Sequence, residues 1–186
     1  MKVFRAEHAM DDAACRRVQA AMDAGIREPT EVLDDEMELR DDVRRAVQIE
    51  VPPAVFEFID RHLDAQGEAI ASFFGWEIVG REGVNLLRYE PGGFYKPHAD
   101  RADMPAWPPA ARRLVTVVLF LESSRAVDPS GGFSGGILRL FPERDDVLPV
   151  EIVPRRGMLV AFPADTVHEV SPVFDGHRDT VVDWFS

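Results

Sequence analysis

The spacing of apolar residues changes near Trp76, and this change limits the folds open to the chain. Before it, apolar residues recur every three or four positions, as on one face of an α-helix. After it, they fall in short runs rich in Val, Leu, Ile and Phe, separated by Gly and Pro, which is typical of β-strands joined by turns. The sequence therefore predicts a mainly helical support region over 1–80 and a β-rich core over 81–186.

Eight short strands are predicted in the second region. They cover 84–89, 94–98, 114–121, 137–141, 150–153, 158–162, 168–170 and 180–185. Short strands in this number, with turn residues between them, favour a double-sheet jelly roll. Two longer loops, 101–111 and 122–136, interrupt the series, and long loops at the mouth of a barrel often carry recognition. The expected fold is mainly β, a jelly roll with N-terminal α-helices packed outside.

Three helices are predicted in the first region. The run from Asp11 to Gly25 has an acidic start, an apolar face and a terminal Gly. A second helix is expected around 35–48. A third begins at Pro52-Pro53, which suits a first helical turn, and continues toward Phe73-Phe74.

Composition narrows the class of protein. At 186 residues and 46% hydrophobic content, the chain is expected to be a single domain with a full core. The absence of a long apolar run and of a signal-like amino terminus predicts a cytoplasmic protein without a membrane partner. A net charge of −12 argues against binding nucleic acid, which requires clustered Lys and Arg.

Cysteine content limits the metal chemistry. Cys15 is the one cysteine, which excludes an internal disulfide and a Cys-rich zinc site. Its place in a predicted helix suggests a small buried hydrophobic residue. His and carboxylate side chains remain as the available metal ligands.

The pattern His-x-Asp occurs three times, and the predicted local structure separates the three copies. They are His62-Leu63-Asp64, His98-Ala99-Asp100 and His177-Arg178-Asp179. The first lies on a predicted helix, where positions i and i+2 point to different sides and cannot share an ion. The third opens the last strand, where the odd-numbered positions are the more polar set and are expected to face water. The second lies where a strand ends, so both side chains project from one face and can converge on a metal.

His168 supplies a third candidate ligand, and Arg178 follows it by ten residues. Two His and one carboxylate with open positions suit a non-haem Fe(II) oxygenase, although zinc could bind the same set. Arg178 favours iron because a guanidinium pairs with a carboxylate at two points and stays charged when partly buried. A dicarboxylic cosubstrate could chelate iron with one end and meet Arg178 with the other.

Several stretches of the β-rich region carry a family resemblance. They are Arg88–Asp100, Arg113–Leu121, Gly135–Leu140, Pro154–Phe162, and His168–Val173 with Gly176–Arg178 and Trp184. Through them the segment from about 83 to 185 resembles the catalytic domain of Fe(II)/2-oxoglutarate-dependent dioxygenases of the prolyl 4-hydroxylase family. That family has a double-stranded β-helix, which agrees with the jelly roll predicted from the strands.

The resemblance implies roles for individual residues. His98, Asp100 and His168 would bind Fe(II), Arg178 would bind the distal carboxylate of 2-oxoglutarate, and Tyr89 would line the cosubstrate pocket. O₂ would be the oxidant, succinate and CO₂ the coproducts, and ascorbate an optional reductant.

Two positions depart from the family pattern. Phe120 stands where the family often has Tyr, and Glu122 stands where Asn is common. Because Phe120 cannot donate a hydrogen bond, cosubstrate anchoring would depend more on Arg178, with Thr180 on the same strand face as a helper.

The sequence indicates the identity of the prime substrate less clearly than that of the cofactors. Candidate walls of the substrate pocket are Tyr95, Trp107, Phe133 and Trp184, although ordinary core packing explains Trp184 at least as well. The leading hypothesis, which rests on the resemblance, is hydroxylation of a prolyl residue of a protein or peptide. The alternatives are hydroxylation of a free amino acid or other small molecule, and a non-catalytic metal-binding jelly roll. The nucleic-acid-demethylating branch of the wider superfamily is disfavoured. Its members have a similar layout but carry a second Arg six residues after the first, where this chain has Trp184.

Overall fold

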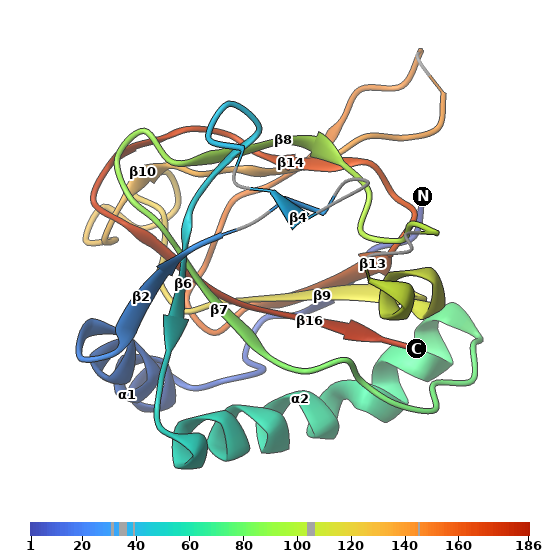
Figure 1. Cartoon of the computed structure of the whole chain (residues 1–186), viewed down its shortest axis with the longest axis horizontal. Coiled ribbons are helices and arrows are strands. Elements are labelled where there is room, and N and C mark those ends of the chain that lie inside the picture. Colours follow the sequence, from blue (N-terminus) through green and yellow to red (C-terminus); the bar gives the residue numbers. More distant parts are fainter. Residues whose placement is uncertain (31, 34–36, 39, 104–106, 145) are drawn as a thin grey trace.

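The computed structural model describes residues 1–30, 32–33, 37–38, 40–103, 107–144 and 146–186. Two antiparallel β-sheets lie face to face, and two helices, α1 (Asp12–Asp23) and α2 (Pro53–Phe74), cover the outer face of the larger one (Figure 1). The fold is the jelly roll with outside helices that the sequence predicts.

The larger sheet has seven strands in the order β1-β13-β9-β16-β7-β6-β2. Their bounds are β1 Phe4–Ala6, β13 Leu159–Pro163, β9 Val115–Phe120, β16 Arg178–Phe185, β7 Asn85–Tyr89, β6 Val47–Glu50 and β2 Ile26–Pro29. β9, β16 and β7 are at its centre, so their inward side chains form the floor of the space between the sheets.

The smaller sheet has five strands in the order β12-β11-β14-β8-β5. Their bounds are β12 Val150–Ile152, β11 Leu138–Leu140, β14 His168–Val170, β8 Phe94–His98 and β5 Arg44–Arg45. Two short pairs lie apart from both sheets: β3 (Val32–Leu33) with β4 (Met37–Glu38), and β10 (Ser134–Gly135) with β15 (Val173–Asp175). A 3₁₀ helix, η1, covers Pro108–Arg112.

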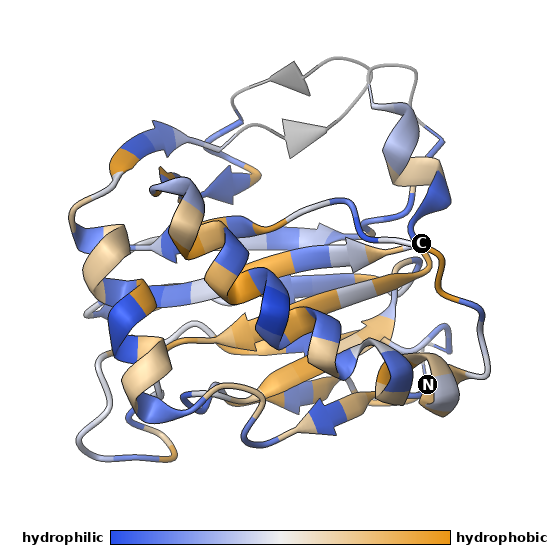
Figure 2. Ribbon diagram, turned by 90° about the horizontal axis from the view of Figure 1, so that it is seen from below, coloured by the Kyte–Doolittle hydropathy of each residue, from blue (hydrophilic) through white to orange (hydrophobic). Residues whose placement is uncertain are grey.

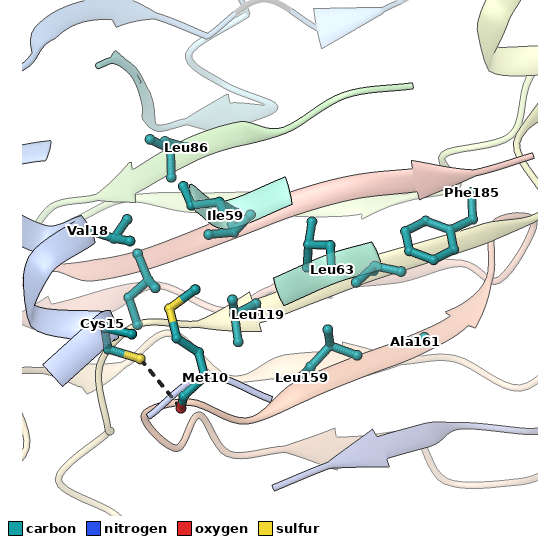
Figure 3. Packing of buried hydrophobic residues seen from close by; sticks show 14 of the residues in the cluster. Met10, Cys15, Val18, Ile59, Leu63, Leu86, Leu119, Leu159, Ala161 and Phe185 are labelled. Carbon is teal, nitrogen blue, oxygen red and sulfur yellow. Dashed lines mark hydrogen bonds between the residues drawn. The ribbon is translucent and has the colours of Figure 1, made fainter. Parts of the chain in front are cut away.

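Helix α2 packs its apolar face against the larger sheet. It begins after Pro52 and ends at Gly75, which adopts φ 73° in the left-handed region that favours glycine. Figure 2 shows α2 crossing hydrophobic strands. Ile59 and Leu63 pack in the same cluster as Leu119 of β9 (Figure 3). Among the described residues, no helix has both the length and the apolar character needed to cross a membrane.

Helix α1 joins the same core. The Asp11 carboxylate accepts a hydrogen bond from the Ala14 N–H at 2.8 Å and so caps the helix. Cys15 is fully buried, which agrees with its expected role as a small hydrophobe, and its thiol points to the Met10 carbonyl (Figure 3).

The eight predicted strands are all present, with bounds that differ by at most two residues.

The helix predicted around 35–48 is wrong for the described residues. Residues 40–48 form a turn, β5 and the start of β6, while 34–36 and 39 lie outside the described ranges. Val47–Glu50 alternates apolar and polar residues with period two, and β6 pairs with both β2 and β7. Pairing with distant strands therefore outweighs the local preference. β1 and β2, also from the amino-terminal region, are further strands of the larger sheet that the sequence did not predict.

The odd-numbered positions of β16 do not face water as expected. Asp179 and Asp183 are 1% and 0% exposed and lie on the helix-covered side of the sheet. Arg88 pairs with Asp179 at 2.7 Å, and Arg81 lies 3.3 Å from Asp183. Arginines from other segments pair with these two carboxylates. The polar odd-numbered residues of β16 therefore form buried ion pairs and do not make up a solvent-exposed face.

Candidate metal centre

Two neighbouring strands of the smaller sheet bring the three predicted ligands together. β8 ends at His98 and β14 begins at His168, and the strand register places these two residues directly opposite each other. Asp100 follows two residues after His98. One ligand atom from each residue lies within 4.8 Å of the other two. The Nε2 atoms of His98 and His168 are each 3.6 Å from an oxygen of Asp100.

Backbone carbonyls set the tautomer of both imidazoles. His98 Nδ1 lies 2.8 Å from the Lys96 carbonyl oxygen, and His168 Nδ1 lies 2.9 Å from that of Thr166. A carbonyl only accepts, so each Nδ1 carries the proton and each Nε2 presents a lone pair. Burial, together with the neighbouring His168, lowers the pKa of His98 to about 3, which keeps this ring in the neutral, metal-binding form.

Asp100 contributes the negative charge of the site. Burial acts to raise the pKa of this carboxyl, but His168, His98 and the neighbouring Trp184 and Thr116 outweigh it and lower the pKa to about 2. Thr116 Oγ1 donates a hydrogen bond of 2.7 Å to Asp100 Oδ2. Two neutral nitrogens and one carboxylate on one side of an ion form the donor set of a non-haem Fe(II) centre. The residues present therefore fit iron.

The triad lies in a cavity of about 430 Å³ between the two sheets. Apolar side chains from both sheets form much of its wall: Leu87, Val118, Leu138, Val170 and Val182. Such walls exclude water and strengthen electrostatic interactions inside the cavity.

Arg178 projects into this cavity from the first position of β16 and is only 2% exposed. Its guanidinium carbon lies 5.1 Å from the centre of the Tyr89 ring and 5.2 Å from that of Phe120. Nη1 is 3.4 Å from Thr180 Oγ1, and Nε is buried without a hydrogen-bond partner among the described residues. Burial lowers the pKa of Arg178 to about 10, so it remains charged at neutral pH. A buried cation of this kind fits the carboxylate of a bound ligand.

Gly136 has no side chain, and this leaves room for the side chain of Arg178. Gly136 has φ 61°, and a Cβ at this position would lie 2.8 Å from Arg178 Cδ. Glycine at position 136 therefore both permits the left-handed backbone and leaves room for the Arg178 side chain.

The four predicted pocket aromatics divide into two groups. Tyr95 and Trp184 line the cavity, and the Tyr95 ring stacks on His98 with ring centres 3.4 Å apart. Trp107 and Phe133, also expected in the wall, lie outside the lining. Trp107 is 39% exposed and donates through Nε1 to Glu82, whereas Phe133 is fully buried beside Gly136. Loop position alone does not show which way an aromatic side chain points.

Other lining residues were missed in the sequence. Val43, Arg44 and Gln48 line the cavity from the segment that was expected to be helical. Arg44 lies over the Tyr95 ring, 4.7 Å from its centre. The period-two alternation of Val47–Glu50 was the signal that could have placed this segment on a strand. Glu122, the second departure from the family pattern, pairs with Arg156 away from the cavity.

Comparison with known proteins agrees with this geometry. The family model described as the 2OG-Fe(II) oxygenase superfamily matches residues 84–186, a little over half the chain. No curated protein sequence matches the chain.

Solved structures similar to the chain include three prolyl hydroxylases. The prolyl-4-hydroxylase of Pseudomonas putida is 25% identical, with a TM-score of 0.72 over 98% of this chain and 91% of that one. The viral collagen prolyl hydroxylase of Paramecium Bursaria Chlorella virus-1, in complex with 2-oxoglutarate, is 22% identical, with a TM-score of 0.68 over 100% and 96%. The Trichoplax adhaerens prolyl hydroxylase, bound to a hypoxia inducible factor peptide, is 17% identical, with a TM-score of 0.75 over 98% and 82%. The chain belongs to the 2OG-Fe(II) oxygenase superfamily and is an Fe(II)- and 2-oxoglutarate-dependent dioxygenase.

Proposed function

We propose that this enzyme hydroxylates a prolyl residue of a protein or peptide and releases succinate and CO₂. The observation that carries the proposal is one cavity holding both a His-Asp-His triad and a buried arginine, Arg178, without a hydrogen-bonded carboxylate among the described residues. The choice of a prolyl substrate is supported by the Pseudomonas putida prolyl-4-hydroxylase, whose likeness extends over almost the whole chain.

In this proposal His98, Asp100 and His168 hold Fe(II) through the two Nε2 atoms and the carboxylate. The bound iron and 2-oxoglutarate supply the oxidising chemistry with O₂. The protein itself orients the ligands, since the two Nδ1–H groups are held by backbone carbonyls.

Arg178 binds the distal carboxylate of 2-oxoglutarate in the same proposal. Tyr89 and Phe120 flank the guanidinium, and Thr180 adds a hydroxyl beside it. A planar guanidinium can pair with a carboxylate at two points.

The prime substrate enters at the opposite end of the cavity. Arg178, Val182 and Trp184 of β16 line the cavity. At ~3.3 Å per residue, Arg178 and Trp184 lie roughly 20 Å apart along the strand. Trp184 lines the cavity at this end, opposite Thr116 in the strand register, and Thr116 contacts Asp100 of the triad. The cosubstrate and the prolyl residue would therefore approach the metal from opposite ends of the same strand.

The test is turnover with proline-rich peptides and with free L-proline, in the presence of Fe(II), 2-oxoglutarate and ascorbate. Mass spectrometry should find one added oxygen on a peptide prolyl residue, together with succinate. His98→Ala should abolish both signals, and the matched His8→Ala, at an exposed position, should retain them. Oxygen added only to free L-proline would replace the peptide substrate by a small molecule. No iron-dependent succinate under any condition would favour a non-catalytic metal-binding module.

A further inference from the structure

Thr116 is a buried polar residue on the cavity side of a strand that is otherwise apolar. It lies on β9, is 1% exposed and lines the cavity next to Val118. The alternate positions of β9, such as Val117, face the helices. Valine has the same branched shape and suits the strand equally well. The hydroxyl is therefore the part of this side chain that packing does not explain, because burying it is unfavourable unless it finds a partner.

The partner of the hydroxyl is the candidate metal ligand Asp100. Thr116 Oγ1 donates to Asp100 Oδ2 at 2.7 Å. Thr116 stands opposite Trp184 in the strand register, at the end of the cavity where the triad carboxylate lies. A hydroxyl on a strand buried at the centre of a sheet is a rigid donor, since the backbone that carries it is held by both neighbouring strands.

The backbone of Asp100 is already held at both ends. Its N–H donates to the Ala164 carbonyl at 3.0 Å, and its own carbonyl accepts from Arg113 Nη1 at 3.0 Å. Arg113 is in turn fixed by two contacts of 2.6 Å with Glu82 and stacks over Trp184 at 3.6 Å.

With the main chain fixed, the side-chain torsions of Asp100 remain, and the terminal one sets the rotation of the carboxylate. The terminal torsion of an Asp side chain has broad minima, so packing sets it only loosely. A strong hydrogen bond to one oxygen removes that freedom.

We infer that Thr116 is a positioning residue of the metal site: its hydroxyl holds the Asp100 carboxylate in the rotation in which the two oxygens face His98 Nε2 and His168 Nε2. In this role Thr116 acts through Asp100, to which its hydroxyl donates. The inference rests on the proposed iron site. Partners that orient a metal ligand commonly change metal affinity ten- to a hundredfold.

The test compares metal binding in the full-length protein without turnover. Co(II) is titrated anaerobically, in the absence of 2-oxoglutarate, into the wild type, T116V, T116S, T30V and H98A. T116V removes the hydroxyl and keeps the shape, whereas T116S keeps the hydroxyl. T30V is the matched control, because Thr30 is also buried and its hydroxyl donates to the Ala46 carbonyl at 3.1 Å.

We expect T116V to bind Co(II) roughly ten- to a hundredfold more weakly. Its Co(II) absorption bands should also shift in position and intensity, since a freely rotating carboxylate changes the coordination. T116S and T30V should retain the affinity and spectrum of the wild type. Thermal unfolding of the metal-free proteins checks that T116V is folded, and T116A replaces it if it is not.

The outcomes separate this inference from the proposed function. Wild-type affinity and spectrum in folded T116V, with binding lost in H98A, would overturn the role of Thr116 and leave the iron site standing. An equal loss in T30V would show that buried hydroxyls act through general stability, which also overturns it. Failure of the wild type to bind Co(II) more tightly than H98A would instead overturn the iron site itself.

Discussion

Arg88 and Asp179 form a two-point ion pair on the helix-facing side of the larger sheet, directly behind Arg178 and Tyr89. The contacts are 2.7 and 2.8 Å. The register that pairs Asp179 with Arg88 also pairs Arg178 with Tyr89. Because successive side chains of a strand point to opposite faces, the ion pair holds the proposed cosubstrate-binding residues side by side on the cavity face.

Removal of this pair should lower stability strongly. Asp179→Ala leaves the buried Arg88 without its main partner, so we expect the free energy of unfolding to fall by about 3–5 kcal/mol. Urea unfolding measures it. Arg16→Ala breaks the exposed pair with Asp12 and should change stability by less than about 0.5 kcal/mol. A loss below about 1 kcal/mol for Asp179→Ala would contradict the importance of the buried pair.

Arg178→Lys should weaken 2-oxoglutarate binding and spare the metal. A lysine keeps the charge but cannot pair with a carboxylate at two points. The loss of a charge-assisted hydrogen bond, about 1.5–3 kcal/mol, corresponds to a roughly ten- to hundredfold weaker affinity. Anaerobic titration of the metal-loaded enzyme checks this. Arg139→Lys, on a residue outside the cavity lining, is the control; an unchanged affinity in Arg178→Lys would remove Arg178 from the proposed role.

Phe120→Tyr should tighten 2-oxoglutarate binding. The Phe120 ring lies beside the Arg178 guanidinium, and a phenol there adds a donor that phenylalanine lacks. One net hydrogen bond of about 0.5–1.5 kcal/mol predicts a gain of up to roughly tenfold. The same titration measures it, with Phe174→Tyr, at a position 72% exposed, as the control. No gain would mean that the added hydroxyl does not reach the cosubstrate.

Cys15 should be unreactive in the folded protein and should make stability depend on pH. Burial raises the pKa of this thiol from its usual 9.0 to about 12. Iodoacetamide at pH 8 should therefore label Cys15 only after unfolding. Between pH 9 and 12 the unfolded thiol loses its proton while the folded one keeps it, so stability should fall as pH rises through this window.

Cys15→Ala should remove that part of the pH dependence, which unfolding at pH 8 and pH 10 would show. Rapid labelling of the native wild-type protein at pH 8 would contradict the buried, protonated thiol.

Much of the fold followed from local pattern. β8 and β14 match their predicted bounds of 94–98 and 168–170, because short runs with aromatic or β-branched residues next to turn residues are typical of strands. The same local geometry selected His98 and Asp100 among three His-x-Asp triplets, and the spacing to Arg178 pointed to an acidic cosubstrate.

The sequence by itself thus determined which residues are the candidates for binding iron and cosubstrate, and that two sheets would hold them. Only the tertiary structure decided where the other polar residues go. The segment Val47–Glu50 forms a strand because it pairs with β2 and β7. Asp179 is buried because it pairs with Arg88, and the buried hydroxyl of Thr116 donates to Asp100. Local propensity is a property of neighbours in the chain, whereas a buried charge or hydroxyl is stabilised by a partner that folding brings from elsewhere.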